Sequence, residues 1–336
     1  MGKARKLLFP VSLLYSGVMQ LRNTLYDREI FESHRFDLPV ICVGNLSVGG
    51  TGKSPMVEYL ISLLHENAKV ATLSRGYKRT TTGFHLLNGK ESAAETGDEP
   101  LQFKTKFPEV MVAVDEKRRH GIEQLLKLES KPEVILLDDA FQHRKVSAGL
   151  NIILTPYNNL YTKDLVLPAG NLREPVSGAD RAKIVMVTKC PENLKDEEKE
   201  RIAKSLKLKE DQELFFSTVA YNPIALSAGS SKSLETFIGK DFCVVTGIAN
   251  PVPFIDYLKK EGLRFEHLKF PDHHNFTSSE LETIKKHPLI LTTEKDYMRL
   301  KGKLPQEKLF YLPIKTKFLG RKEKFDEIIE TYITKK

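Results

Sequence analysis

Short, nearly continuous apolar runs alternate with helical patterns from residue 38 onward. The runs are PVICVG (39–44), KVATLS (69–74), EVILLD (133–138), LNIILT (150–155) and AKIVMVT (182–188). Strands that are buried on both faces of a parallel sheet have such runs, whereas half-exposed strands alternate apolar and polar residues. The segments SPMVEYLISLLHENA and KRRHGIEQLLKL lie between the runs and repeat apolar residues at helical spacing. The alternation of strand and helix predicts an α/β fold with a parallel sheet and right-handed crossovers.

The pattern stops between residues 222 and 238 and then starts again. A charged segment follows Pro191, and SAGSSKS further along the chain is typical of a turn or linker. Three new apolar segments follow, in DFCVVTGIANP, LRFEHLKF and PLILTTEKD. We predict an N-terminal helical segment over residues 1–35, a larger α/β domain over 36–222 and a smaller α/β domain over 223–336. The chain of 336 residues is long enough for two domains of roughly 150 residues each.

The N-terminal segment joins basic residues to an apolar stretch. Lys3, Arg5 and Lys6 precede LLFPVSLLYSGVMQL, which ends before Arg22 and is shorter than the about 20 residues that a spanning helix needs. The apolar residues at helical spacing are Leu7, Val11, Leu14, Tyr15, Val18, Leu21 and Leu25. The pattern predicts an amphipathic helix at a membrane interface, with basic residues on anionic headgroups. A helix packed on the protein's own core remains an alternative, and a signal peptide fits less well because Pro10 interrupts the stretch.

The composition, with 40% hydrophobic and 29% charged residues, excludes a disordered or collagen-like chain. The 52 Lys and Arg residues exceed the 44 Asp and Glu residues, which gives a net charge of +8. This excess favours an acidic partner such as nucleic acid, an anionic membrane or a phosphorylated substrate. The three cysteines, Cys42, Cys190 and Cys243, lie in or beside apolar runs without C-x-x-C spacing. They indicate a reducing compartment and neither disulfide bonds nor a zinc site.

A glycine-rich segment follows the first predicted strand and resembles the phosphate-binding loop G-x-x-x-x-G-K-[ST]. Its residues are Ser47, Val48, Gly49, Gly50, Thr51, Gly52, Lys53 and Ser54, with Ser47 at the position of the first glycine. Glycines let backbone N–H groups close around phosphate oxygens, and the N-terminus of the following helix attracts the anion. We expect Lys53 to contact the β- and γ-phosphates of ATP and the Ser54 hydroxyl to reach Mg²⁺.

A pair of carboxylates, Asp138 and Asp139, ends the predicted strand EVILLD. Because the carboxyl ends of parallel strands meet at one edge of a sheet, we expect these side chains to hold Mg²⁺ beside the phosphate-binding loop. The segment VTKCP ends another strand at Thr188, but it has Pro191 where guanine-specific GTPases have aspartate. This difference weakens an interpretation as a GTPase.

Seven blocks, in order along the chain, resemble those of a known family. They are VGNLSVGGTGKSP, LSRGYKR, TGDEP, DDAFQHR, LPAGNLREP, FPDHHNF and TTEKD. On these blocks, most of the chain resembles the tetraacyldisaccharide 4′-kinases (lipid A 4′-kinases), a family of P-loop kinases. This chain has Ala140 where the family often has glycine, and a methyl group fits there unless the backbone needs a positive φ.

The resemblance implies transfer of the γ-phosphoryl group of ATP to the 4′-hydroxyl of a tetraacyldisaccharide 1-phosphate, which gives lipid IVA. It also implies two α/β domains beside a cleft, at the cytoplasmic face of the bacterial inner membrane. By the same resemblance, Asp98 is the expected base, and Asp272 and His273 come from the smaller domain. His273 is the expected partner of Asp98, and His274 remains an alternative. Lys53 is a further catalytic residue, and Glu99 is expected to join the Mg²⁺ ligands.

Six residues of the remaining blocks are candidate contacts to nucleotide or substrate: Arg75, Gln142, His143, Asn171, Arg173 and Glu174. Guanidinium groups suit phosphate oxygens, whereas Gln142 and His143 serve equally well to orient the aspartate loop. Two alternatives remain open, a P-loop kinase for another glycolipid or small metabolite and an NTP-driven switch or metallochaperone. Nucleic acid is not expected as a partner because the sequence has no nucleic-acid motif.

Overall fold

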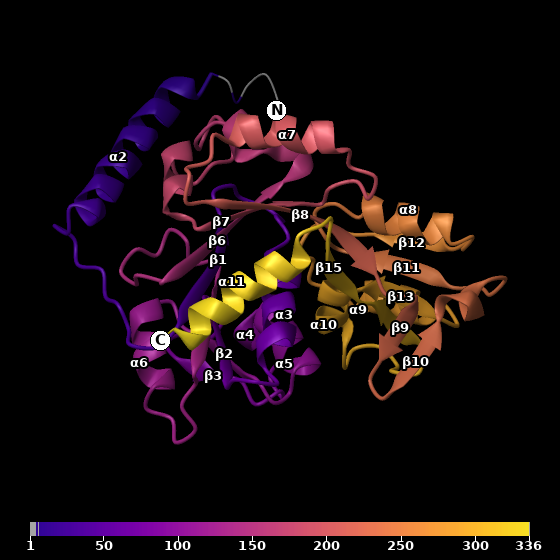
Figure 1. Cartoon of the computed structure of the whole chain (residues 1–336). Helices are drawn as coiled ribbons and strands as arrows, with labels where there is room; N and C mark the ends of the chain where they lie inside the picture. The colour runs from indigo at the N-terminus through magenta and orange to yellow at the C-terminus, as the bar shows by residue number, and fades with distance from the viewer. Residues whose placement is uncertain (1–4, 6, 336) are drawn as a thin grey trace.

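The computed structural model describes residue 5 and residues 7–335, which form two β-sheets flanked by helices (Figure 1). The larger sheet has nine strands in the order β15-β8-β7-β6-β1-β5-β2-β4-β3, and the smaller has six in the order β10-β9-β14-β13-β11-β12. These sheets and their helices confirm the predicted α/β class. Lys3 and Lys6 of the predicted basic segment lie outside the described residues.

The larger sheet is parallel from β8 to β4, and its two edge strands, β15 and β3, are antiparallel. Its strands are β1 (Val40–Asn45), β2 (Val70–Ser74), β3 (His85–Leu86), β4 (Met111–Val114), β5 (Val134–Asp138), β6 (Leu150–Pro156), β7 (Ile184–Thr188), β8 (Glu213–Tyr221) and β15 (Ile314–Phe318). Its helices are α2 (Phe9–Asp27), α3 (Lys53–Leu64), α4 (Ala93–Thr96), α5 (Asp98–Lys106), α6 (Arg118–Leu125), α7 (Asp196–Leu206) and α11 (Lys322–Thr334). The five apolar runs of the sequence are β1, β2, β5, β6 and β7, so the strand prediction is confirmed for them.

Helices cover both faces of this sheet, which explains why its strands have apolar residues at successive positions rather than at every second one. In β1, Ile41 and Val43 pack in one buried cluster with residues of α3 and α11. Val40 and Cys42 point the other way and pack in a second cluster with residues of α6 and α7. Because each strand residue is buried on one face or the other, an apolar side chain is favoured at every position.

The smaller sheet has four parallel strands, β14-β13-β11-β12, extended by the antiparallel strands β9 and β10. Its strands are β9 (Ile224–Ser227), β10 (Ser230–Ser233), β11 (Cys243–Thr246), β12 (Glu266–Lys269), β13 (Ile290–Thr293) and β14 (Leu309–Leu312), and its helices are α8 (Val252–Lys260), α9 (Ser278–Lys285) and α10 (Glu294–Leu300). Short 3-10 turns occupy Tyr157–Asn159, Tyr161–Lys163, Val176–Arg181 and Leu234–Phe237. The three apolar segments predicted after residue 238 are β11, β12 and β13.

The chain passes between the two sheets twice. It leaves the larger sheet after β8 and returns through β15, and α11 then crosses the larger sheet (Figure 1). Phe325 and Ile329 of α11 are fully buried, and the hydroxyl of Tyr332 bonds the backbone N and O of Val40 at 3.2 and 3.1 Å. The smaller unit, predicted as 223–336, is thus formed by residues 224–312. The sequence did not predict that β15 returns to the larger sheet. The strand's residues alternate apolar and polar from Ile314 to Phe318, unlike the continuous apolar runs of the central strands.

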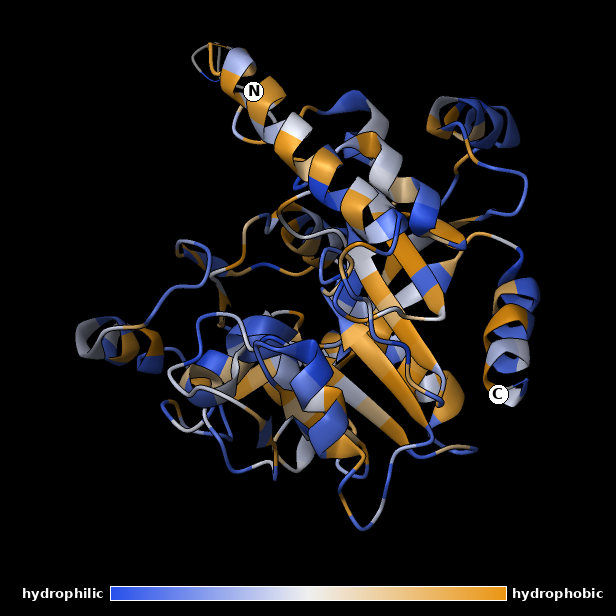
Figure 2. Cartoon of the chain, turned by 90° about the vertical axis from the view of Figure 1, so that its left-hand side faces the viewer, coloured by the Kyte–Doolittle hydropathy of each residue, from blue (hydrophilic) through white to orange (hydrophobic). Residues whose placement is uncertain are grey.

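Helix α2 packs on the protein through its polar side. Ser12 and Asn23 are buried, and Tyr15 Oη donates to Arg173 O at 3.0 Å. The apolar residues of α2, whose hydrophobic turns are orange in Figure 2, are largely exposed: Phe9, Val11, Leu13, Leu14, Val18 and Leu21, with Leu7 and Leu8 just before the helix. Leu14 exposes 72% of its surface, which excludes the alternative that the apolar stripe packs on the core. Within the described part of the chain, no helix is both long and apolar enough to cross a bilayer.

A buried charge cluster joins α3, α5 and α10. Lys106 Nζ lies 2.6 Å from Glu58 Oε2 and 3.2 Å from Glu294 Oε1, and Gln102 Nε2 donates to Glu58 Oε1 at 2.6 Å. Two buried carboxylates therefore share one ammonium group. Burial and the charge of Glu58 raise the pKa of Glu294 to about 7, against the opposing effect of Lys106.

The raised pKa of Glu294 predicts a specific pH dependence of stability. The folded state holds this proton more tightly than the unfolded state, so the group's stabilising contribution is complete below pH 4.5 and is lost as pH rises through about 7. Glu294→Gln removes this loss and is expected to raise the melting temperature at pH 8 by roughly 2–5 °C, with no gain at pH 4.5. Thermal denaturation of both proteins from pH 4.5 to 8 measures it; an equal shift at every pH would contradict the assignment.

Candidate active site

The phosphate-binding loop joins β1 to α3 at the carboxyl edge of the larger sheet. Gly52 immediately precedes α3 and has φ +95°, a conformation that costs glycine little because it has no Cβ. Lys53 is therefore the first residue of the helix, and Ser54 behind it is buried. Because no side chain caps α3, its first backbone N–H groups are available to phosphate oxygens.

Two neighbouring segments hold this loop. Val48 N donates to Asn171 O at 2.8 Å, and the Asn171 side chain donates to Asp164 Oδ2 at 2.9 Å. On the other side, Thr188 Oγ1 at the end of β7 donates to Thr51 O at 2.7 Å. Asn171, predicted as a ligand contact, thus supports the loop through its backbone carbonyl, while its side chain bonds Asp164.

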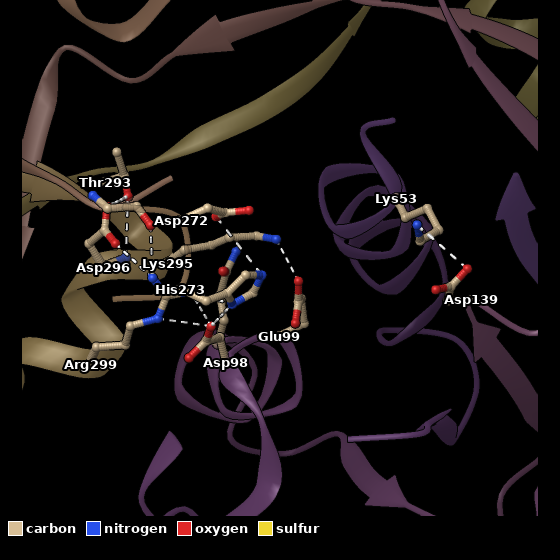
Figure 3. A network of polar contacts seen from close by, with 12 residues as sticks. Lys53, Asp98, Glu99, Asp139, Asp272, His273, Thr293, Lys295, Asp296 and Arg299 are labelled. Carbon is tan, nitrogen blue, oxygen red and sulfur yellow. Dashed lines mark hydrogen bonds and ion pairs between the residues drawn. The ribbon is translucent and has the colours of Figure 1, made fainter. Parts of the chain in front are cut away.

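Asp138 and Asp139 end β5 beside the lysine of the loop. Asp139 Oδ1 lies 3.6 Å from Lys53 Nζ (Figure 3) and accepts a hydrogen bond from Arg173 Nη1 at 2.7 Å. One carboxylate therefore fixes both cations that were predicted to face phosphate. The left-handed residue in this turn is Asp139, with φ +49°, and Ala140 needs no positive φ, as its methyl group requires.

The residues at this edge fit a hard cation. Asp138 Oδ1 is buried and has no hydrogen-bond partner among the described residues. Burial raises the pKa of this carboxyl to about 7, Lys53 opposes the shift, and Asp139 adds to it. The described residues contain no group of three His, Cys, Asp or Glu side chains that could hold a metal ion unaided. A magnesium ion here would therefore take phosphate oxygens as further ligands, as is usual for this ion.

A second polar cluster joins the two sheets at Asp98, the first residue of α5 (Figure 3). Arg299 of α10 donates to Asp98 Oδ2 from Nη2 and, at 2.9 Å, from Nε, and His273 Nδ1 lies 3.1 Å from the same oxygen. Burial by itself raises the pKa of the Asp98 carboxyl, but the contacts with His273 and Arg299 and the guanidinium charge bring it down to about 2. Asp98 is therefore fully ionised at neutral pH.

The two adjacent histidines have different partners. His273, with φ +58°, meets Asp98, and its Nε2 lies 4.0 Å from Oδ1 of the half-exposed Asp272. His274 instead places Nε2 2.9 Å from Glu280 Oε2. The structure therefore shows the contact that the sequence favoured, between Asp98 and His273.

Glu99, the predicted metal ligand, forms an ion pair with Lys295 of α10 (Figure 3). Burial raises the pKa of Glu99, but the charge of Lys295 outweighs it and the pKa is lowered. Glu99 and Lys295 also act on the pKa of Asp138, in opposite directions, so this pair lies near the phosphate-binding edge. Glu99 must exchange Lys295 for a metal ion to serve as predicted.

Gln142 and Glu174 form a hydrogen-bond network beside the carboxyl end of β1. Glu174 is fully buried, and it accepts hydrogen bonds from Asn23 at 2.8 Å and from Gln142 and Arg181 at 2.9 Å. Gln142 also donates to Asn45 O at the end of β1 at 2.9 Å. These side chains tie α2 and the 164–174 loop to the sheet, and their contact with substrate stays a prediction.

Arg75 and His143 lie near one another, because they follow the neighbouring strands β2 and β5 at the carboxyl edge of the larger sheet. Arg75 directly follows β2, is exposed and has no partner among the described residues. Burial, Arg118 and Arg75 together lower the pKa of the half-buried His143 to about 4, so its imidazole is neutral at physiological pH. Arg75 therefore remains available to an anion, as predicted for it.

Sequence reasoning missed three cations of the site. Lys295 and Arg299 belong to or follow the block TTEKD, and their spacing of four residues places both on one face of α10. That spacing is a signal for a pair of acidic partners, which are Asp98 and Glu99. Lys189 donates from Nζ to Gly50 O at 2.6 Å, and only its position beside the predicted strand end pointed to the loop.

With a nucleotide loop on one sheet and a carboxylate positioned from the other, the fold defines a phosphotransferase of the P-loop class. The family model for tetraacyldisaccharide-1-P 4′-kinases (LpxK) matches residues 4–334. The chain belongs to this family, and it is a kinase of lipid A biosynthesis, as the resemblance predicted.

Individual relatives agree with the family match over nearly the whole chain. The tetraacyldisaccharide 4′-kinase of Flavobacterium johnsoniae is 50% identical, with 99% of this chain and 98% of the relative covered. That of Bacteroides thetaiotaomicron is 46% identical over 98% and 94%. The crystal structure of LpxK from Aquifex aeolicus in complex with ATP has a TM-score of 0.80 and 34% identity, covering 98% of this chain and 99% of that one. ATP binding is thereby supported for this chain as well.

The supporting position of Glu174 predicts a loss of stability. Glu174→Ala is expected to lower the free energy of unfolding by about 3 kcal/mol, because Arg181 and two amides lose their shared buried acceptor. Urea denaturation measures the change, with Glu192→Ala in an exposed ion pair with Lys317 as the control that stays near wild type. If Glu174→Ala instead raised the KM for the lipid and left stability unchanged, Glu174 would be the substrate contact that the sequence predicts.

Proposed function

We propose that this kinase transfers the γ-phosphoryl group of ATP to the 4′-hydroxyl of tetraacyldisaccharide 1-phosphate and so forms lipid IVA. The observation that carries the proposal is the Asp98–His273–Arg299 cluster, which sets a carboxylate from α5 beside groups of the smaller sheet, near the phosphate-binding loop. The acceptor of the phosphoryl group is inferred from the relatives, which are tetraacyldisaccharide 4′-kinases. The activity predicted from the sequence resemblance is the same.

The acceptor hydroxyl gives its proton to Asp98 as the new oxygen–phosphorus bond forms and the bond to the ADP oxygen breaks. A carboxylate with a pKa of about 2 is a weak base, so it accepts the proton only when bond formation has made the hydroxyl acidic. A loose transition state, in which bonding to the nucleophile is still slight, suits such a late proton transfer. Asp98 therefore acts first by orienting the hydroxyl.

Charge on the transferred phosphoryl group is met from the larger sheet. Lys53 at the start of α3 lies 3.6 Å from Asp139, and no side chain caps the first backbone N–H groups of that helix. Ser54, Asp138 and Asp139 are the residues that would hold Mg²⁺, which neutralises phosphate charge when bound. Glu99 joins them if ligand binding frees it from Lys295.

Asp98→Asn tests the role of the acceptor carboxylate. The amide keeps a hydrogen-bond acceptor for Arg299 but cannot take a proton, so kcat is expected to fall by about 10²-fold or more. Binding of ATP, measured by calorimetry, is expected to stay unchanged because Asp98 is not part of the phosphate-binding loop. Asp256→Asn on the exposed side of α8 is the matched control. Near-normal kcat in Asp98→Asn would contradict the role.

We also propose that α2 docks the kinase on the cytoplasmic face of the inner membrane. Its polar side is bound to the 164–174 loop, through Ser12 Oγ, which accepts from Ala169 N at 2.8 Å, and through the Tyr15 hydroxyl. Its apolar side is free for lipid, and Ile30 and Phe31 continue the exposed apolar surface beyond the helix. An interfacial helix of this kind delivers the enzyme to an acylated substrate without spanning the bilayer.

The outward face of α2 can be altered without disturbing its anchorage. Replacing Leu14, Val18 and Leu21 by serine removes exposed apolar area and is expected to reduce partition onto phosphatidylglycerol vesicles by at least about tenfold. Flotation of the full chain measures the loss, with Gln20→Ala on the same helix as the control. Equal flotation of the triple variant and wild type would reject the proposed docking surface.

A further inference from the structure

Arg299 lies at the centre of the contact between α5 and α10, and its guanidinium group reaches four acceptors. Besides Asp98, Nη1 donates to Asp296 Oδ1 and to Gly247 O, both at 3.0 Å, and Nη2 lies 2.8 Å from His273 Nδ1. We propose that Arg299 is a positioning residue of phosphoryl transfer, which selects the reactive oxygen of Asp98 and the nitrogen of His273 that carries the ring proton. This inference rests on the proposed function of Asp98.

The first selection concerns the two oxygens of the carboxylate. Both Nε and Nη2 of Arg299 donate to Oδ2 of Asp98. Among the described residues, no hydrogen bond reaches Oδ1, and the Asp98 side chain keeps 11% of its surface exposed. Arg299 therefore occupies one oxygen fully and leaves Oδ1 as the atom that a substrate hydroxyl meets.

The second selection concerns the histidine tautomer. A guanidinium group only donates hydrogen bonds, so Nδ1 of His273 accepts when it lies 2.8 Å from Arg299 Nη2. A proton on Nδ1 would suit the Asp98 carboxylate at 3.1 Å, but it would place two donors against each other at the shorter distance of 2.8 Å to Arg299, and the shorter contact decides. The ring proton is therefore assigned to Nε2, which turns toward Asp272. Without Arg299, Nδ1 would face only the Asp98 carboxylate and would carry the proton itself.

Arg299 is itself held in place. Asp296 is fully buried and accepts hydrogen bonds from Gly247 N at 2.9 Å and from Thr293 Oγ1 at 2.7 Å, besides its ion pair with Arg299 (Figure 3). A Cβ at Gly247 would lie 3.0 Å from Asp296 Oδ1, so glycine permits this close approach. The guanidinium plane is fixed from the smaller sheet before it reaches Asp98.

A lysine cannot replace this arrangement, because one ammonium group is a single point of charge on a flexible stem. It cannot meet Asp98, His273 and Asp296 together as the planar fork does. Arg299→Lys keeps the positive charge, and its expected effect is a fall in kcat of about tenfold or more with the KM for ATP unchanged. Arg299→Gln is expected to lose about 10²-fold. Arg321→Gln, in an exposed ion pair with Glu213, is the matched control.

A double-mutant cycle separates positioning from general stability. If Arg299 acts through Asp98, adding Arg299→Gln to Asp98→Asn lowers kcat no further than Asp98→Asn alone. Losses that multiply, or an Arg299→Lys variant with at least half the wild-type kcat, would overturn the proposal. Melting temperatures show whether each variant is folded. If Arg299→Gln does not fold, the kcat of Arg299→Lys decides the test.

A spectroscopic readout tests the tautomer even if the lipid proves not to be the substrate. In the full chain with ¹⁵N-labelled histidine, His273→Asn identifies the His273 signals. Wild type is expected to show a protonated Nε2 and a bare Nδ1, and Arg299→Gln the reverse. Unchanged shifts in a folded Arg299→Gln protein would overturn the inference. Absence of lipid phosphorylation by wild type would instead reject the proposed function.

Discussion

The structure depends on the ion pairs between α5 and α10. Asp98 pairs with Arg299 and Glu99 with Lys295 at one end, and Lys106 pairs with Glu294 at the other. Asp98 and Lys106, at the two ends of α5, meet Arg299 and Glu294 at the opposite ends of α10, so the two helices run in opposite directions. Each of these four charges also complements the dipole of its own helix, whereas Lys295, in the first turn of α10, does not. These contacts set the smaller sheet against the nucleotide edge of the larger one.

Such pairs fix an arrangement more than they stabilise it. Removing two ions from water costs several kcal/mol for each ion, and their attraction offsets this cost only in good geometry. An apolar contact between the helices would be as stable but would tolerate sliding. Charges that match at both ends of α5 permit one register only. A phosphotransferase needs this restriction because a displacement of about 1 Å between base and phosphate costs much of the rate.

The sequence was most informative where burial is two-sided or chemistry is local. The five apolar runs predicted five central strands because β1, β2, β5, β6 and β7 are covered on both faces, and SVGGTGKS predicted its loop because phosphate binding calls for Gly52, Lys53 and Ser54 at this spacing. It was least informative where partners lie far apart in the chain. Asp98 and Arg299 are separated by 201 residues, and neither shows its partner locally. For Glu174 the block resemblance predicts a ligand contact and the structure shows a buried acceptor, because a block resemblance does not distinguish a side chain that binds from one that supports.

The double crossing between the sheets makes the smaller unit an insertion in the larger one. Its strands enter after Tyr221 and leave before Ile314, so the nucleotide sheet is completed only when β15 and α11 have been synthesised. During synthesis, β1 cannot form its contact with Tyr332 until the end of the chain is made, because the two bonded residues, Val40 and Tyr332, lie 292 residues apart. The smaller unit, in contrast, is finished while the larger remains open. The last residues of the chain thus complete the sheet that its first strands begin, and removing α11 would expose the apolar side chains that Phe325 and Ile329 cover.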